Sequence, residues 1–326
     1  MALSAPTLSL KRTLLYALCF ATFALALPNV HAQEEFIDFN KYQNEERQWA
    51  NLKTKTLKVG DVIWTYSEAG SSNKPTLLLI HGIGANRDSW NQIARALSLD
   101  YHLIIPDLPG SGDTKVADNF DLSLQNLTDQ LRRFVEASHI QNQLHLAGHS
   151  VGGSIALMYA SQYHYDTKSL FILGAGGILK KNQTNYLNNP IYLKQLLIQQ
   201  PGDLDFVSRK VMYNPPFVPS IIKKQYEQHL IKNAQHTARL INQLTDMNKQ
   251  YSLSSFKEML GHITAPTLIL WGKQDQIVNV EIAQELKNSI KNAQQPIILN
   301  HVGHIPMLEA PERVSQSYAA FLNTVQ

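Results

Sequence analysis

Six short apolar runs, separated by longer amphipathic stretches, are the feature of this sequence that most restricts its fold. Runs of this length, bounded by Gly, Pro, Asp or Asn, are typical of strands buried on both faces. Strands that alternate with helices predict an α/β fold with a mostly parallel sheet covered by helices on both sides. The runs are 77–80, 103–105, 144–147, 170–173, 267–271 and 297–299, and the helical patterns are 88–98, 122–138, 153–163, 279–291 and 312–324.

Two other regions complete this architecture. Residues 54–59 and 62–67 alternate between polar and apolar side chains and predict a leading hairpin, which brings the sheet to eight strands. From 177 to 262 there is no strand-like run, and the apolar spacing is helical. An insertion of this length between two core strands indicates a helical cap or lid. Its middle, Pro215-Pro216-Phe217-Val218-Pro219, cannot be helical throughout.

The N-terminus has the pattern of a secretory signal peptide. Lys11 and Arg12 precede an apolar run at 13–27. In the segment Val30-His31-Ala32 that follows, small residues stand at −3 and −1 of a cleavage site after Ala32. The run is shorter than the roughly 20 residues of a membrane span. We therefore expect export to the bacterial periplasm or beyond, with an uncleaved membrane anchor as the alternative. The predicted division is a signal peptide at 1–32, an α/β core at 33–176 and 263–326, and a cap at 177–262.

Charge and cysteine content exclude several classes of function. The chain has 29 basic and 26 acidic residues, a formal net charge of +3, and no block of like charge. No surface for nucleic acid is therefore expected. Cys19 is the only cysteine and would leave with the signal peptide, so disulfides and thiolate metal sites are not expected in the mature chain. We expect a monomer that acts on a small molecule.

The segment Gly148-His149-Ser150-Val151-Gly152 carries the strongest chemical signal. It directly follows a predicted strand and opens a predicted helix. A sharp strand-to-helix turn of this kind exposes the serine hydroxyl at the carboxyl end of the sheet, and the glycines leave room for neighbouring backbone. We therefore predict that Ser150 is a nucleophile, and we interpret His149 as a packing residue.

A serine nucleophile needs a base, and the base needs an acid that orients it. Asp275 lies just beyond the strand at 267–271, whereas Gly174 offers no carboxylate after the strand at 170–173. After the last strand, His304 is favoured as the base over His301. A metal site on these two histidines is disfavoured, because no third ligand accompanies them.

Backbone amides are the expected donors to the oxyanion of an acyl intermediate. One is the N–H of Val151, which follows the nucleophile, and the other is the N–H of Ile83 in the loop His81-Gly82-Ile83-Gly84. The turn at 107–112 is interpreted as a brace for the site, because it has no lysine and no following helix that would suit a phosphate.

Candidate substrate contacts are less well defined. We name His81, Met212, Phe217 and Val218, although His81 is favoured as a side chain that braces its loop. The apolar residues of the cap could line an acyl channel or form the cap's own core.

Several segments appear in the order found in one large superfamily. They are His81-Gly82, Asp107-x-Pro109-Gly110-x-Gly112, Gly148-His149-Ser150-Val151-Gly152-Gly153, Trp271-Gly272-x-x-Asp275 and Gly303-His304-x-Pro306-x-x-Glu309-x-Pro311-Glu312. The chain resembles the α/β-hydrolase superfamily. The phrases at 101–107 and 211–216 more narrowly resemble the secreted family V lipases and esterases of cold-living Gram-negative bacteria. Where relatives carry an Asp after the sixth strand, this chain has Gly174.

The resemblance implies hydrolysis of carboxylic esters, including acylglycerols, without a metal or organic cofactor. The sequence thus predicts a secreted serine hydrolase that works through Ser150, Asp275 and His304 and an acyl-enzyme. Two alternatives are a carbon–carbon bond hydrolase on the same fold, which the signal peptide disfavours, and a non-catalytic binding protein, which the complete triad disfavours. Acyl chain-length preference and contact of the cap with a lipid surface stay open.

Overall fold

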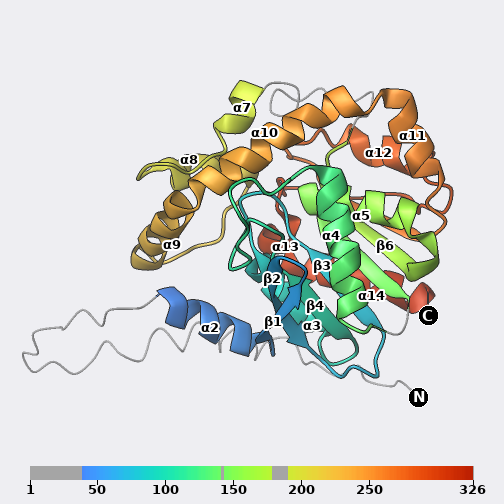
Figure 1. The fold of residues 1–326 in the computed structure, drawn as a ribbon, viewed down its shortest axis with the longest axis horizontal. Coiled ribbons are helices and arrows are strands. Elements are labelled where there is room, and N and C mark those ends of the chain that lie inside the picture. The colour runs from blue at the N-terminus through green and yellow to red at the C-terminus, as the bar shows by residue number, and fades with distance from the viewer. Residues whose placement is uncertain (1–38, 141–142, 178–189, 326) are drawn as a thin grey trace, which may run out of the picture. The chain divides into compact units, whose positions relative to one another are not determined.

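A mixed sheet of eight strands forms the centre of the computed structural model, which describes residues 39–140, 143–177 and 190–325, all in one structural unit (Figure 1). The strand order is β1-β2-β4-β3-β5-β6-β7-β8; β1 pairs with β2 and β2 with β4 antiparallel, and the other pairs are parallel. The predicted fold class is confirmed. The strands are β1 (Lys53–Val59), β2 (Val62–Ala69), β3 (Thr76–Ile80), β4 (His102–Pro106), β5 (Leu144–His149), β6 (Thr167–Leu173), β7 (Thr267–Gly272) and β8 (Ile297–Leu299).

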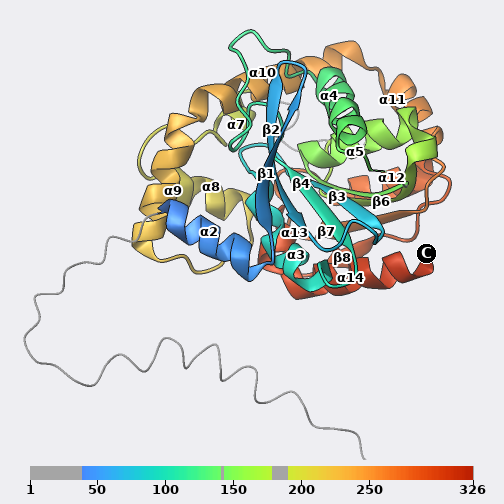
Figure 2. The same cartoon turned by 60° about the horizontal axis from the view of Figure 1, so that its bottom comes forward.

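Helices cover both faces of this sheet (Figures 1 and 2). On β3, Leu78 and Ile80 pack in one core cluster, whereas Leu77 and Leu79 pack in the other. Burial on both faces explains why the strands are continuous apolar runs in the sequence. The first cluster includes residues of α4 (Leu124–Ala137), α5 (Val151–Gln162) and α12 (Glu281–Ser289), and the second includes residues of α3 (Asn91–Leu97) and α14 (Pro311–Thr324).

Among the described residues, five helices of the cap follow β6 and precede β7. The proline-rich segment at 215–219 lies between two of them and is not helical, as its composition requires. Residues 178–189 lie outside the described residues, and the proposed cap boundaries stay a prediction. The helices are α7 (Pro190–Lys194), α8 (Asp203–Val211), α9 (Ser220–Lys232), α10 (Ala234–Gln250) and α11 (Leu253–Gly261).

A helix that precedes the sheet, α2 (Phe39–Trp49), packs against the cap. The rings of Phe39 and Tyr226 on α9 lie 5.6 Å apart, and α2 runs beside α9 in Figure 2. The remaining short elements are η1 (Arg87–Trp90), η2 (His164–Asp166) and α13 (Pro306–Glu309). Across the described ranges, none of the helices is both long enough and apolar enough to cross a bilayer. The predicted signal peptide lies outside these ranges.

Candidate active site

The turn between β5 and α5 holds Ser150 in a strained conformation. Its φ is 54° and its ψ is −120°, a backbone region that residues other than glycine rarely occupy. The backbone N–H of Ser150 donates to the carbonyl of Leu173 at the end of β6, at 2.9 Å. A Cβ on Gly152 would lie 2.4 Å from the carbonyl oxygen of His81, so the turn can pack against the β3 loop only with glycine there. This geometry is the sharp nucleophile turn that the sequence predicts.

Ser150, His304 and Asp275 form a continuous chain of polar contacts. The Oγ of Ser150 lies 3.0 Å from Nε2 of His304, and Nδ1 of His304 lies 2.8 Å from Oδ2 of Asp275. Because a carboxylate only accepts hydrogen bonds, Nδ1 carries the proton and Nε2 is left to accept from the serine hydroxyl. All three side chains are buried. The structure therefore brings together the three residues that the sequence selects as a triad.

Two backbone N–H groups that follow Asp275 in the chain fix the orientation of its carboxylate. Its Oδ1 accepts hydrogen bonds from the N–H groups of Ile277 and Val278, at 2.8 and 2.9 Å, which leaves Oδ2 for His304. Gly174 faces the same histidine, since a Cβ there would lie 3.2 Å from Nδ1. No second carboxylate can stand in from position 174, so orientation of the ring depends on Asp275.

Two contacts hold the backbone of His304 from opposite sides. Its N–H donates to the carbonyl of Val211 in the cap at 2.7 Å, and its carbonyl accepts from Nε2 of His149 at 2.7 Å. Burial, together with the nearby His304, lowers the pKa of His149 to about 3, so that ring stays neutral. His149 acts here as a support for the base, in line with its interpretation as a packing residue.

Glu309 joins the cap to the loop that carries the base. Its Oε2 accepts from the N–H groups of Tyr213 and Asn214, at 2.8 and 3.0 Å. The same carboxylate accepts from Gly303 at 2.9 and 3.0 Å and from Ile305 at 3.4 Å. In the sequence, Glu309 stands in a motif that assigns it no role of its own. Only the folded chain shows that its acceptors meet amides from two distant segments.

The two predicted oxyanion donors, Ile83 and Val151, both border the cavity at Ser150. Val151 is the first residue of α5, so its N–H has no acceptor within the helix. His81 shapes the other loop: its Nε2 accepts from Leu108 N–H at 3.0 Å and its Nδ1 donates to the Gly82 carbonyl at 2.8 Å. With both ring nitrogens engaged and no exposure, His81 is not a substrate contact, which corrects that candidate.

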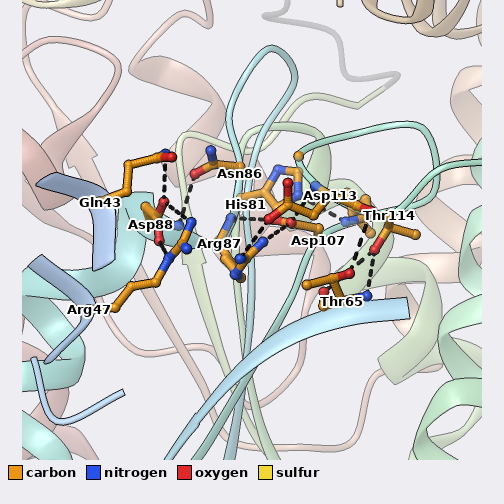
Figure 3. A network of polar contacts seen from close by, with 12 residues as sticks. Gln43, Arg47, Thr65, His81, Asn86, Arg87, Asp88, Asp107, Asp113 and Thr114 are labelled. Atoms are coloured by element: carbon orange, nitrogen blue, oxygen red, sulfur yellow. Dashed lines mark hydrogen bonds and ion pairs between the residues drawn. The ribbon is translucent and has the colours of Figure 1, made fainter. Parts of the chain in front are cut away.

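A buried ion pair braces the same loop (Figure 3). Asp107 lies in a salt bridge with Arg87, and its Oδ1 also accepts from the Arg87 backbone N–H at 2.7 Å. The guanidinium reaches Asp113 as well, at 2.8 Å. The turn at 107–113 therefore holds the segment that follows the predicted oxyanion loop, which is the bracing role expected from the sequence.

The cavity beside Ser150 and His304 has a volume of about 430 Å³. Met212 and Val218 line it, as expected of substrate contacts. Phe217 does not: it is 90% exposed and is not one of the residues that line the cavity, which corrects that candidate.

One part of the cavity lining was not predicted from the sequence. Helix α2 contributes Phe39, Tyr42, Gln43 and Glu46 to the lining. These residues lie more than 100 positions before Ser150 in a polar stretch without a motif, so no sequence signal linked them to the site.

Among the described residues, His301 and His304 are not part of any group of side chains that could hold a metal ion. Within the residues that the structure describes, no group of three or more His, Cys, Asp or Glu side chains could hold a metal ion. The exposed His301 packs instead against Tyr213, with ring centroids 5.7 Å apart.

Comparisons with known proteins agree with this geometry. The family model described as alpha/beta hydrolase fold matches residues 75–311. Lipase 1 of Psychrobacter immobilis is 32% identical over 96% of this chain and 99% of its own length, and Lipase 3 of Moraxella sp. (strain TA144) is 30% identical over 90% of each. The crystal structure of the protein named lip1 from Acinetobacter baumannii AYE has a TM-score of 0.88 at 51% identity, covering 92% of this chain and 99% of that one. This chain belongs to the α/β-hydrolase fold family and is a homologue of bacterial lipases.

Proposed function

We propose that this protein is a serine hydrolase that cleaves carboxylic esters, including acylglycerols. The observation that carries the proposal is the chain of contacts from Ser150 through His304 to Asp275 beside a cavity of about 430 Å³. Lipase relatives that align over 90% or more of the chain support the same reaction class. Apolar cap side chains along the cavity, such as Leu204, Val207 and Ile222, suit an acyl chain.

In the proposed reaction, the Oγ of Ser150 attacks the ester carbonyl while Nε2 of His304 takes the hydroxyl proton. The N–H groups of Ile83 and Val151 stabilise the oxyanion. The imidazolium then protonates the leaving alcohol, which departs and leaves the acyl group on Ser150. Water repeats the sequence and releases the carboxylic acid. Asp275 holds the ring in the reactive tautomer and stabilises its cation.

Export of the protein is part of the proposal. The basic residues Lys11 and Arg12, the apolar run at 13–27 and the small residues before position 33 support cleavage after Ala32. Sequencing of the N-terminus of protein isolated from an expressing bacterium tests this directly. A mature chain that starts at Gln33 is expected, and a chain that retains residues 13–27 would contradict it.

We also propose a transient contact between the cap and a lipid surface. Tyr213, Phe217 and Val218 are exposed on the segment between α8 and α9, and Val218 also borders the cavity. A lipid that binds this segment would therefore lie beside the cavity.

The test of the proposed function is a rate profile across p-nitrophenyl esters from C2 to C16, together with an emulsified triacylglycerol. Ester hydrolysis that disappears in Ser150→Ala is expected. Activity restricted to C2–C4 esters would retain the esterase and exclude the lipase. Absence of hydrolysis across the whole series would contradict the proposed function.

A further inference from the structure

The loop that carries one of the predicted oxyanion donors also contacts the cap. Ile83 stands between two glycines, so its side chain is the only one between His81 and Ala85. This side chain is partly buried and packs against two separate apolar clusters. One cluster contains residues of the sheet, and the other is formed by residues of the cap.

Three buried residues form the second cluster, which we call the cap cluster. They are Leu193 on α7, Leu197 in the segment that follows α7, and Ile241 on α10. Helices α7 and α10 lie side by side in the cap (Figure 1). Ile83 is a residue of the core that packs against this cluster, and it thus joins the cap to the active site.

Hydrogen bonds hold the backbone of this loop only weakly. Among the described residues, the N–H groups of Ile83 and Gly84 have no hydrogen-bond acceptor. The turn bond from the Ala85 N–H to the Gly82 carbonyl is long, at 3.4 Å. A Cβ at Gly84, where φ is 67°, would meet no atom within 4 Å, so close packing does not fix that residue either. The Ile83 side chain is therefore the main contact that holds this part of the loop.

The Ile83 N–H follows directly on the contact between the loop and the nucleophile turn. A Cβ on Gly82 would lie 3.0 Å from Cβ of Ser150, so the two backbones are close there. An oxyanion donor has to lie about 2.7–3.1 Å from the oxygen that becomes negative, and a displacement of about 1 Å can cost about 10²-fold in rate. A donor flanked by two glycines shifts easily unless its side chain is held.

We propose that the cap cluster positions the oxyanion donor by holding the side chain of Ile83. In this proposal the backbone N–H of Ile83 is the catalytic group, and its side chain and Leu197 are positioning groups. The cap therefore contributes to the rate even for an ester whose acyl group is too short to contact the acyl-binding side chains. This inference rests on the proposed ester hydrolysis.

The variant Ile83→Ala separates the position of the N–H from its presence. It keeps the backbone donor and removes the side chain that packs against the cap cluster. For p-nitrophenyl acetate, we expect kcat to fall about 10-fold, with KM changed by less than about 2-fold. An acetate ester is used because loss of contacts with a long acyl chain cannot lower its rate.

The variant Leu197→Ala tests the cap side of the contact. Leu197 is 7% exposed and is not one of the residues that line the cavity, so it acts on the reaction only through other residues. We expect kcat for p-nitrophenyl acetate to fall about 5-fold. Leu197→Met conserves the side-chain volume and should keep kcat within about 2-fold of wild type. If Leu197→Ala does not fold, Leu197→Val, which lacks one methylene, should give a decrease of about 2-fold.

Inhibition by trifluoroacetone measures stabilisation of the oxyanion directly. The Oγ of Ser150 bonds to the ketone carbon, the carbonyl electron pair moves to the oxygen, and the hydroxyl proton passes to Nε2 of His304; no group leaves. The inhibition constant should rise about 10-fold in Ile83→Ala and about 5-fold in Leu197→Ala, in parallel with the fall in kcat. A purely structural role of the cluster would leave this constant unchanged.

The variant Leu260→Ala is the control for loss of a buried cap side chain. Leu260 lies on α11, which packs against α5 and α12, and it is not one of the residues that line the cavity. Because Leu260 is fully buried, the substitution should lower the melting temperature at least as much as Leu197→Ala. Its kcat and its inhibition constant for trifluoroacetone should stay within about 2-fold of wild type.

The outcomes separate the positioning role from the reaction. If Ile83→Ala and Leu197→Ala keep the wild-type kcat and inhibition constant, the cap does not position the donor, and ester hydrolysis stands. If both variants are slower only with long-chain esters, the cluster binds the acyl chain and the proposal is overturned. An equal loss of kcat in Leu260→Ala would also overturn it, since cap stability would explain the result. If the wild-type protein hydrolyses no ester, the proposed function fails and this inference fails with it.

Discussion

The core and the cap border the same cavity, but their residues are held there in different ways. On the core side, Ser150, Asp275 and His304 follow the ends of strands, and each has directional hydrogen bonds to backbone or side-chain partners. On the cap side, Leu204 and Val207 of α8 contribute apolar surface from a helix. Proton transfer requires fixed directions, whereas an acyl chain requires only volume and apolar contact. In the proposed reaction, the core therefore carries out the chemistry, and the cap contributes apolar volume for the acyl chain.

The largest effect should come from the core. Ser150→Ala removes the atom that attacks the ester, and we expect kcat to fall at least about 10³-fold. Ser154→Ala is the matched control: Ser154 also borders the cavity, but its hydroxyl bonds to the Gly176 carbonyl at 2.9 Å. Initial rates on p-nitrophenyl butyrate measure both variants. Near-normal turnover by Ser150→Ala would show that the core side of the cavity does not supply the nucleophile.

Acid should destabilise the core through its buried histidines. Burial lowers the pKa of His145 to about 4, with Lys168 contributing, and that of His149 to about 3. Below pH 6.5, these two histidines bind more protons in the unfolded chain than in the folded chain. Their contribution to the free energy of unfolding is therefore complete above pH 6.5 and is lost as the pH falls towards 4. We expect the melting temperature to drop by about 5 °C or more from pH 7 to pH 5.

The variant His145→Asn tests the origin of this drop. Asparagine can place a polar atom near the position of Nδ1, which lies 2.8 Å from the hydroxyl of Ser169, but it does not titrate in this range. The decrease in melting temperature between pH 7 and pH 5 should become smaller. His139→Asn at the exposed His139 is the control for the loss of a histidine. A wild-type melting temperature that is constant across this range would refute the prediction.

Glu309 tests whether the cap supports the base as well as the substrate. Glu309→Gln replaces an acceptor oxygen with an NH₂ group, which would face the amide of Tyr213 or Gly303. We expect kcat to fall about 10-fold, roughly 1.4 kcal/mol, with a smaller change in KM. Glu312→Gln on the exposed start of α14 is the control. A change in KM alone would show that the contacts of Glu309 serve only substrate binding.

The smallest effect should come from the surface of the cap. Phe217→Ser is expected to weaken binding to phosphatidylglycerol vesicles about 3-fold, because it removes one exposed apolar side chain. Hydrolysis of a soluble butyrate ester should not change. Tyr165→Ser removes a similarly exposed aromatic side chain from η2, which lies outside the cap, and should leave vesicle binding intact. Equal losses in both variants would contradict a docking role of the cap.

The same contrast explains how much the sequence predicts. Buried strands are continuous apolar runs because both their faces are covered, so 77–80 and 267–271 indicated their structure directly. The Ser150 turn has its own local motif, and the order of Ser150, Asp275 and His304 along the chain limits the choices for the acid and the base.

The cap and α2 offered no comparable signal. An apolar side chain on a cap helix follows the same helical period whether it lines a cavity or packs within the cap. The exposure of Phe217 and the place of Val218 at the border of the cavity therefore depend on how the segment between α8 and α9 packs. The contribution of Glu46 and the bridge through Glu309 depend on contacts between segments far apart in the sequence.

In the proposed reaction, His304 activates the serine at the β5–α5 turn. A fluorophosphonate reacts covalently with such a serine and only poorly with an ordinary hydroxyl group. Mass spectrometry of the digested, labelled protein should find one adduct, on the peptide that contains Ser150, and should find it neither in heat-unfolded protein nor in Ser150→Ala. A native protein that stays unlabelled, or that carries the label on a different serine, would contradict the account.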